Sequence, residues 1–371
     1  MTAAGPEHRE PRRSSRRTVL VVTACAVLAL VVGVAWRPAP TRLPDATTGD
    51  AALGQLGREL VGDDRPYLAV ACVTPDSLRT AVMGARATDR FEIGSISKGL
   101  TGLLLADMIE GGDVRADTTV GTLLPVTGAL ADVTLSELAT HTSGLPTQLP
   151  TLSQAGRNYW ASLTAGNPYG GSVQQRLDAL GDVALDAEPG TYSNLGFELL
   201  GASLAAAADR PYRDLLRERI LTPVGLTRAT VPYADAELTD ADLLGQTAGG
   251  RTADAWLGAA LAPAGGVRSD IGEMASLTQQ LLTGRAPGVD ALKPKVTADG
   301  SPTGWAWITQ PSPLNDRTVT WHNGGTGGFT SFLGIDQERQ TGVVILSAVQ
   351  EPANNTTRAG FELLERIGDC A

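Results

Sequence analysis

The stretch Phe91-Glu92-Ile93-Gly94-Ser95-Ile96-Ser97-Lys98-Gly99-Leu100 places a serine three residues before a lysine, at the start of an apolar segment. Positions i and i+3 share one face of a helix, so Ser95 and Lys98 can meet if Ser95 opens a helix. That helix is predicted by apolar residues that recur at helical spacing until Gly111-Gly112 ends it, namely Ile96, Leu100, Leu103, Leu104 and Ile109. A serine at a helix start also lies among free backbone N–H groups, which stabilise developing negative charge.

Lysine is rare in this chain, which makes its presence here informative. Of the 30 basic residues, only Lys98, Lys293 and Lys295 are lysine. Arginine keeps its proton near neutral pH, whereas a desolvated lysine can release it. The pair therefore predicts a proton-transfer site, although a helix cap followed by a solvated lysine would show the same spacing.

Length and charge limit the classes of function. The chain of 371 residues can bury a large core and form one or two domains. Its formal net charge is −10, residues 1–17 carry a net of +3, and residues 18–36 carry no charge, which leaves −13 on the remainder. So acidic a body argues against nucleic-acid binding, because phosphate backbones need a basic face.

The N-terminus is predicted to be a targeting segment. A basic tail at 1–17 precedes the uncharged run 18–36, whose 19 residues would span roughly 28 Å as a helix, close to the ~30 Å of a bilayer core. Arginine before the run predicts a cytoplasmic tail and a body outside the cytoplasm. A signal anchor fits the length best, while Gly33-Val34-Ala35 would suit cleavage and secretion, and Ser15-Arg16-Arg17 resembles a twin-arginine export signal. Residues 37–50, rich in Pro, Thr and Asp, are predicted to be a linker.

The three cysteines leave two interpretations open. Cys25 lies in the apolar run, Cys72 in a predicted strand, and Cys370 is the penultimate residue. In an oxidising compartment Cys72 and Cys370 could form a disulfide; otherwise Cys72 is a buried thiol and Cys370 part of a frayed tail. No cysteine has a metal-ligand spacing and the chain has three histidines, so neither a metal site nor another cofactor is predicted.

The order of predicted elements indicates an α+β fold for residues 51–371. A helix over 51–61 and a hairpin over 67–73 and 78–84 precede the Ser95 helix. A helical region, about 96–250, then follows, with helices at 135–141, 172–180, 195–208 and 212–221. The last third holds a helix over 270–282, strands over 304–309, 318–322, 328–335 and 342–349, and a closing helix over 355–367. Short connections between consecutive strands require antiparallel pairing, which predicts an antiparallel sheet flanked by N- and C-terminal helices, with a cleft beside the inserted helical region.

Two further motifs follow the serine and lysine in order. Tyr192-Ser193-Asn194 lies 97 residues after Ser95, and His322-Asn323-Gly324-Gly325 begins 130 residues after Tyr192. The three motifs occur in this order, together with the flanking stretches Leu138–Pro146 and Pro263–Val267. In this respect the chain resembles the serine β-lactamase and D-alanyl-D-alanine peptidase superfamily, in its class C β-lactamase-like branch. The resemblance covers roughly residues 55–350 and implies the β-lactamase/transpeptidase-like fold. Tyr192 and Asn194 could otherwise form a turn and a helix N-cap.

The resemblance implies a role for each motif residue. Ser95 would be the acylated nucleophile, and Lys98 and Tyr192 are both candidates for its base. Asn194 would contact the substrate and orient Lys98, and the oxyanion hole would be the backbone N–H groups of Ser95 and Gly325. The remaining implied substrate contacts are His322, Gly324 and Gln148, although Gln148 could equally be an exposed loop amide. His141 is predicted to end a helix without taking part in catalysis, and Trp305 and Trp307 to share one strand face.

His322 departs from the family pattern, because β-lactamases have lysine at this position. A histidine is mostly uncharged near neutral pH and binds a substrate carboxylate less well. The sequence thus predicts an exported or membrane-anchored serine hydrolase acting on esters, on D-amino-acid peptides such as cell-wall peptides, or weakly on β-lactams. Two alternatives stay open: a membrane-anchored penicillin- or peptide-sensing module that acylates without turnover, and an inactive homologue. The sequence leaves the oligomeric state open.

Overall fold

The computed structural model describes residues 21, 23–25, 38–181, 183–298, 300–351 and 355–366. It divides into two compact units, Met1–Ala39 and Pro40–Ala371. In the first unit, residues 21 and 23–25 are helical, and the rest of the predicted span 18–36 lies outside the described residues. No helix among the described residues is long and apolar enough to cross a membrane, so the span stays a prediction.

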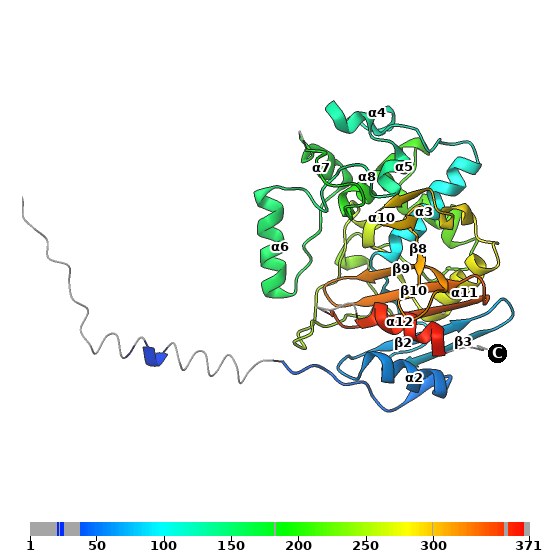
Figure 1. Ribbon diagram of the computed structural model, residues 1–371. Coiled ribbons are helices and arrows are strands. Elements are labelled where there is room, and N and C mark those ends of the chain that lie inside the picture. Colours follow the sequence, from blue (N-terminus) through cyan, green and yellow to red (C-terminus); the bar gives the residue numbers. More distant parts are fainter. Residues whose placement is uncertain are drawn as a thin grey trace, which may run out of the picture. The chain divides into compact units, whose positions relative to one another are not determined.

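The second unit is built on one nine-stranded antiparallel sheet (Figure 1). The strands follow the order β1-β3-β2-β11-β10-β9-β8-β7-β6. Their bounds are β1 Thr47–Gly49, β2 Leu68–Val73, β3 Leu78–Met83, β6 Val296–Ala298, β7 Ser301–Thr303, β8 Ile308–Pro311, β9 Thr318–Gly325, β10 Thr330–Asp336 and β11 Thr341–Ser347. The predicted hairpin of β2 and β3 and the consecutive pairing of β9, β10 and β11 are confirmed.

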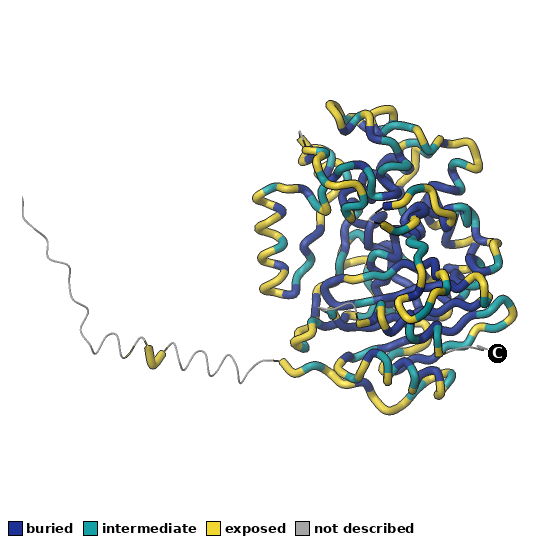
Figure 2. Tube along the Cα trace, viewed as in Figure 1, coloured by how far each residue is buried: buried dark blue, intermediate teal, exposed yellow. Residues whose placement is uncertain are grey.

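Both faces of the central strands are buried (Figure 2). On β2, Ala69 and Ala71 belong to the core under the helical region, while Leu68 and Val70 belong to the core on the opposite face. The second face is covered by α2 (Ala51–Val61) and α12 (Asn355–Arg366), which pack on each other, and the first by α11 (Ile271–Leu282). This arrangement confirms the predicted sheet flanked by N- and C-terminal helices and explains why β2 is continuously apolar.

The helical region begins with α3 (Ile96–Glu110), which Ser95 precedes as predicted. The remaining helices in and after the region are α4 Val120–Leu123, α5 Leu135–Ala139, α6 Leu152–Thr164, α7 Val173–Asp178, α8 Asn194–Ala207, α9 Tyr212–Leu216 and α10 Ala262–Gly265. Single turns lie at η1 Gly128–Asp132, η2 Arg217–Leu221, η3 Asp235–Glu237 and η4 Val289–Leu292. A separate two-stranded sheet pairs β4 (Phe91–Glu92), directly before Ser95, with β5 (Arg268–Ser269).

The strand predicted over 304–309 is wrong in its first half. β8 begins only at Ile308, and Ala306, with φ +72°, turns the chain between two buried tryptophans. Trp307 packs directly on α3, where a Cβ on Gly99 would lie 2.7 Å from its ring. The alternation of large and small residues that suggested a strand comes instead from a turn folded onto a helix.

The predicted linker over 37–50 is also wrong at its C-terminal end. Thr47–Gly49 form β1, and Thr47 pairs with Met83 of β3. An edge strand of three residues is too short to show the period-2 pattern in sequence. Cys72 on β2 takes part in a disulfide, and Cys370 lies outside the described residues, so their pairing stays a prediction.

Candidate active site

Ser95 lies at the N-terminus of α3 with its hydroxyl free of any capping bond. Gly94, with φ +53°, makes the turn that presents it, and a Cβ on Gly94 would lie 2.7 Å from the backbone nitrogen of Gly325. A side chain at this glycine would therefore push the end of β9 away from Ser95. The structure thus brings together the two segments predicted to supply the oxyanion hole, whose role stays a prediction.

Lys98 lies one helical turn after Ser95, fully buried, with its amine directed at three oxygen atoms. Nζ is 3.1 Å from Ser95 Oγ, 2.7 Å from Asn194 Oδ1 and 2.6 Å from the carbonyl oxygen of Ala264. The amide and carbonyl oxygens can only accept, so they take the two N–H groups of a neutral amine and leave its lone pair for the Ser95 hydroxyl. Burial lowers the pKa of Lys98 to about 7, although the carboxylate of Glu198 raises it. The geometry suits a base that is neutral at physiological pH.

Asn194 holds Lys98 because a different residue caps α8. The N-cap is Ser193, whose hydroxyl accepts from the Gly196 N–H at 2.9 Å. Asn194 is thus free to accept from Lys98, and its Nδ2 donates to the hydroxyl of Tyr169 at 2.8 Å. The structure shows the contact between Asn194 and Lys98, its role in orienting the amine stays a prediction, and the alternative of an Asn194 cap is wrong.

Tyr192 presents its ring beside the lysine, 4.7 Å from Nζ to the ring centroid. The residue is 39% exposed, and its phenol is hydrogen-bonded to Ser95. Burial raises the pKa of this phenol well above its usual value, and the hydrogen bond to Ser95 lowers it only in part. A protonated phenol donates rather than accepts a proton at neutral pH, so the structure favours Lys98 as the base.

His141 packs its ring against the Tyr192 ring. Its ring lies 4.7 Å from the Tyr192 ring, centroid to centroid, and Nδ1 accepts from the Ser193 N–H at 3.1 Å. Burial lowers the pKa of His141 to about 3, so the ring stays neutral. His141 follows the end of α5, as predicted, and it also positions the tyrosine.

His322 lies on β9 with 2% of its surface exposed. Its Nδ1 lies 2.6 Å from the Asn323 carbonyl oxygen, and because a carbonyl only accepts, Nδ1 carries the proton. Burial, and then the nearby Lys98, lower the pKa of His322 to about 4. The side chain is therefore neutral at pH 7. It lines a pocket with His141 and Tyr192, and Ser95 is not among the residues of that pocket. Its role in substrate binding stays a prediction.

Neutral burial of His322 predicts a pH dependence of stability. The folded pKa of about 4 lies below the ordinary 6.5, so the unfolded chain takes up this proton first as the pH falls from 6.5 to 4. The side chain therefore costs about 3 kcal/mol of folding stability across this window, at ~1.4 kcal/mol per pH unit. We expect His322→Gln to lose correspondingly less stability than the wild type between these pH values, measured by urea unfolding.

The wild type at pH 8 is the internal control for this comparison, because His322 is neutral there in both the folded and the unfolded state. The difference between wild type and His322→Gln should then be constant above pH 7 and change only below it. Parallel stability curves from pH 8 to pH 4 would contradict a neutral, buried histidine.

Ser95 opens onto a pocket of about 330 Å³, which it shares with Tyr192, Asn323, Gly324 and Gly325. Gly324 is required by close packing, since a Cβ there would lie 2.1 Å from the Ile93 carbonyl oxygen. Among the described residues that line this pocket, Glu351 is the one charged side chain, and it is paired with Arg65 at 2.9 Å. The described lining thus offers no cation to a substrate carboxylate.

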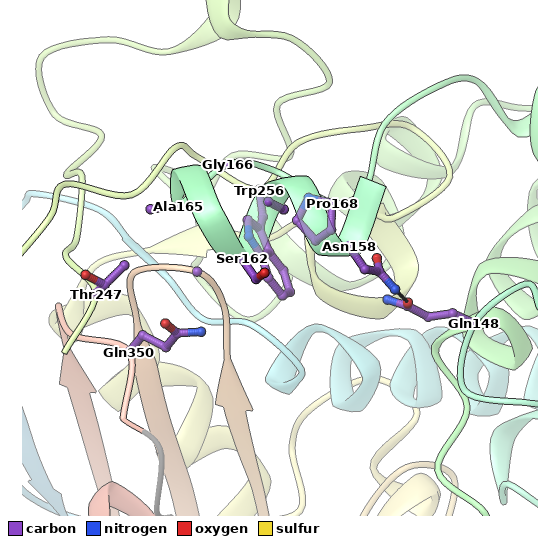
Figure 3. A pocket seen from close by; sticks show the side chains of 11 residues that line it. Gln148, Asn158, Ser162, Ala165, Gly166, Pro168, Thr247, Trp256 and Gln350 are labelled. Carbon is purple, nitrogen blue, oxygen red and sulfur yellow. Dashed lines mark hydrogen bonds between the residues drawn. The ribbon is translucent and has the colours of Figure 1, made fainter. Parts of the chain in front are cut away.

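Both the nitrogen and the oxygen of the Gln148 side-chain amide are hydrogen-bonded within the protein. Nε2 donates to the Tyr169 hydroxyl at 2.6 Å, and Oε1 accepts from Asn158 Nδ2 at 2.6 Å. Gln148 and Asn158 line a second pocket, of about 230 Å³, together with Trp256 and Gly327 (Figure 3). Each end of the amide uses one of its two hydrogen-bonding positions here, and the contact of Gln148 with substrate stays a prediction.

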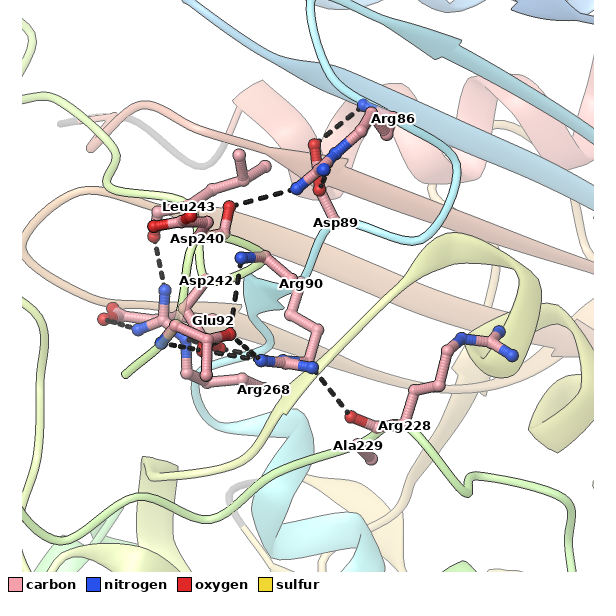
Figure 4. Close-up of polar contacts among 12 residues, drawn as sticks. Arg86, Asp89, Arg90, Glu92, Arg228, Ala229, Asp240, Asp242, Leu243 and Arg268 are labelled. Carbon is pink, nitrogen blue, oxygen red and sulfur yellow. Dashed lines mark hydrogen bonds and ion pairs between the residues drawn. The ribbon is translucent and has the colours of Figure 1, made fainter. Parts of the chain in front are cut away.

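A buried ion network supports the strand that leads into Ser95 (Figure 4). Arg268 on β5 is 1% exposed and pairs with Glu92 at 2.8 Å and with Asp242 at 3.2 Å. Glu92 Oε1 also accepts from the Trp256 backbone N–H at 2.9 Å, and Asp242 pairs with Arg90 at 2.6 Å. The network thus ties β4, β5 and two loops together beneath the catalytic turn.

We expect Arg268→Met to lower the free energy of unfolding by about 3–5 kcal/mol, because Glu92 would remain buried without its cation. Urea unfolding measures this loss. Arg115→Met is the matched control: Arg115 pairs with Asp117 at 2.8 Å, but both side chains are exposed, so the loss should be far smaller than for Arg268→Met. Equal losses in the two variants would contradict a structural role for the network.

Three participants in the site were not predicted from sequence. Tyr169 bridges Gln148 and Asn194 from a loop without any motif. The Ala264 carbonyl holds Lys98 through its backbone, which any residue could supply. Glu198 lies buried on α8, paired with Arg176 at 2.6 Å, and burial raises its pKa to about 7.

Among the described residues, no cluster of three or more His, Cys, Asp or Glu side chains could hold a metal ion.

Comparison with known proteins agrees with this geometry. A beta-lactamase family model matches residues 58–365. The chain is 26% identical over 280 residues to the D-alanyl-D-alanine-carboxypeptidase/endopeptidase AmpH of Escherichia coli (strain K12), over 68% of this chain and 69% of that protein. It is 23% identical over 317 residues to a beta-lactamase of the same strain, over 75% and 80% of the two chains. A solved class C beta lactamase from Rhodobacter sphaeroides shares the fold, with a TM-score of 0.71 and 22% identity over 85% of this chain and 98% of that one. These matches confirm the resemblance predicted from the ordered motifs.

Proposed function

The chain belongs to the beta-lactamase family, and from this premise we propose an exported serine hydrolase that forms an acyl ester on Ser95. Its proposed substrates are esters and D-amino-acid peptides, with weak action on β-lactams. The contact of Lys98 with both Ser95 and Asn194 is the observation that carries the proposal. A serine hydroxyl is unreactive without a base, and this amine lies at hydrogen-bond distance with a pKa of about 7, which leaves a large fraction without its extra proton at physiological pH.

The proposed reaction begins with proton transfer from Ser95 Oγ to Lys98 Nζ as Oγ attacks the substrate carbonyl. Negative charge develops on the carbonyl oxygen, where the backbone N–H groups of Ser95 and Gly325 would stabilise it. The Tyr192 phenol, hydrogen-bonded to Ser95, would pass a proton to the departing alcohol or amine. Lys98 then passes its proton to the Tyr192 phenolate, which restores both groups. Water attacks the acyl ester as Lys98 takes one of its protons, the bond to Oγ breaks, and Oγ takes that proton back from Lys98 as the acid leaves.

The charges around Ser95 support a substrate that has no carboxylate close to the bond that is cleaved. His322 is neutral, and Glu351 is the charged group in the described lining of the Ser95 pocket. A penicillin carries a carboxylate on the ring carbon attached to its lactam nitrogen, and this carboxylate would meet no fixed positive charge in the described lining. Esters and internal peptide bonds lack that carboxylate, and AmpH, whose name includes both a carboxypeptidase and an endopeptidase, supports peptides as one class.

The proposed location is the outer face of the cell membrane. The basic residues 1–17 followed by the uncharged run 18–36 support an anchor, with secretion after cleavage as the alternative. Mass spectrometry of the chain purified from its host membranes tests this, because cleavage would remove the peptides that begin at Met1.

The catalytic proposal is tested with an activated ester, a D-alanyl peptide and a fluorescent penicillin, with the mass of intact protein read during turnover. We expect an adduct on Ser95 and multiple turnovers with the ester. Ser95→Ala should fold normally and form no adduct, since a hydroxyl in a cleft contributes little stability. An adduct without turnover would support the sensing module, and equal activity of wild type and Ser95→Ala would support an inactive homologue.

A further inference from the structure

Helix α6 carries its apolar residues on the solvent side. Leu152 is 94% exposed, Tyr159 67%, Trp160 66% and Leu163 49%. These positions are seven, eight and eleven apart, so they share one helix face, to which the exposed Ala155 and Gly156 also belong. Of the nine large apolar side chains that are exposed among the described residues, four lie on this one helix. α6 stands at the edge of the body in Figure 1 and is largely yellow in Figure 2.

Polar contacts hold α6 in this orientation. The buried Gln154 donates to Asn158 Oδ1 at 2.8 Å and to the Pro168 carbonyl at 3.2 Å. Asn158 in turn donates to Gln148, which is hydrogen-bonded through Tyr169 to the residue that holds Lys98. Turning the apolar face inward would break this chain of hydrogen bonds. The exposed face is therefore specified by the structure, and an exposed apolar face of this kind marks a contact surface.

The charge of the segment that holds α6 favours a lipid surface over a protein partner, although the exposed Asp254 of another loop lies beside Gly166 at its C-terminal end. No acidic residue occurs between Glu137 and Asp178, although the chain has 40 aspartates and glutamates, and Arg157 adds a positive charge on α6 itself. Tryptophan and tyrosine beside leucine are the residues that partition to the membrane interface. Residues 37–46 alone separate the proposed anchor from β1, so the body of an anchored chain would stay within reach of the bilayer.

We propose that α6 lies flat on the surface of an anionic bilayer, with Leu152, Tyr159, Trp160 and Leu163 inserted among the lipid headgroups. The inference rests on the proposed membrane location, but it needs a contact by α6 that is separate from residues 18–36. Since Asn158 and Ser162 of α6 also line the pocket beside Gln148, this contact places the entrance of that pocket next to the lipid.

Hydrogen exchange of the full-length chain, read by mass spectrometry of its peptides, tests the contact. The chain is compared in detergent-free buffer and on vesicles of phosphatidylcholine and phosphatidylglycerol. We expect amides of residues 152–164 to exchange about tenfold more slowly on vesicles, while those of α12, a helix with an exposed face of its own, stay unchanged. Trp160→Gln with Leu163→Gln should remove this protection. Leu314→Gln is the matched control, because Leu314 is also 49% exposed but lies away from α6 in sequence and should leave the protection intact.

Two other outcomes of the exchange experiment would overturn the inference. Protection of 18–36 without protection of α6 would show an anchored chain whose α6 does not touch lipid. Protection of α6 in buffer that grows with protein concentration would show self-association instead. Loss of the Ser95 adduct leaves these readings unaffected, so the failure of the proposed chemistry and the failure of the membrane contact are distinguishable.

Discussion

Lys98→Arg is expected to lower the rate of Ser95 acylation by about 10³-fold or more, although it keeps a positive charge at the same position. The base must be an amine without its proton, and burial lowers the pKa of Lys98 to about 7, so a large fraction is neutral at physiological pH. Arginine stays protonated even when it is buried. It would also present more N–H donors to a site that offers two fixed acceptors, Asn194 Oδ1 and the Ala264 carbonyl. The rate of adduct formation, read by the mass of the protein, measures the effect.

The control for this prediction is Lys293→Arg, at an exposed lysine paired with Asp290, which should acylate at the wild-type rate. Thermal unfolding of both variants separates loss of chemistry from loss of fold, since a bulkier side chain at a fully buried position strains its neighbours. Acylation by a folded Lys98→Arg within tenfold of the wild type would show that Lys98 is not the base.

The catalytic pair could be predicted from sequence because it is local. Ser95 and Lys98 are one helical turn apart, so the helix alone brings their side chains together. Tyr192, Asn194 and His322 could be assigned only through the order of motifs in a family, because nothing local links them to Ser95. Tyr169 escaped both routes, since its contacts with Gln148 and Asn194 depend on tertiary structure and no motif surrounds it.

The same distinction explains the fold. Strands β2, β10 and β11 bury apolar runs, which sequence patterns report directly. α6 was missed because its apolar residues face solvent and its buried positions, Gln154 and Ala161, are polar or small. The segment Trp305–Trp307 was misassigned because a turn packed on α3 gave the alternation of a strand. Sequence patterns thus fail where apolar residues are exposed or where buried positions hold polar or small residues.

Tyr192→Phe is expected to lower acylation by about 10²-fold while leaving the midpoint of its pH dependence near 7. The phenol is hydrogen-bonded to Ser95 and its pKa is raised by burial, so it is protonated throughout the physiological range. It can pass a proton to the leaving group but cannot take one from Ser95 at pH 7. The variant therefore loses a proton donor and keeps its base. Tyr159→Phe, at a tyrosine on the exposed face of α6, is the control and should acylate at the wild-type rate.

The pH profile of acylation decides between the two base candidates that the sequence left open. With Lys98 as the base, the rate falls about tenfold per pH unit below 7, because the neutral amine becomes rarer, and it levels off above 7. Removing the phenol then shifts the whole profile downward without changing its shape. With Tyr192 as the base, the profile would instead lose its acid limb in the Phe variant, because no titrating base would remain. The shape of the Tyr192→Phe profile therefore assigns the proton, and an unchanged midpoint near 7 assigns it to Lys98.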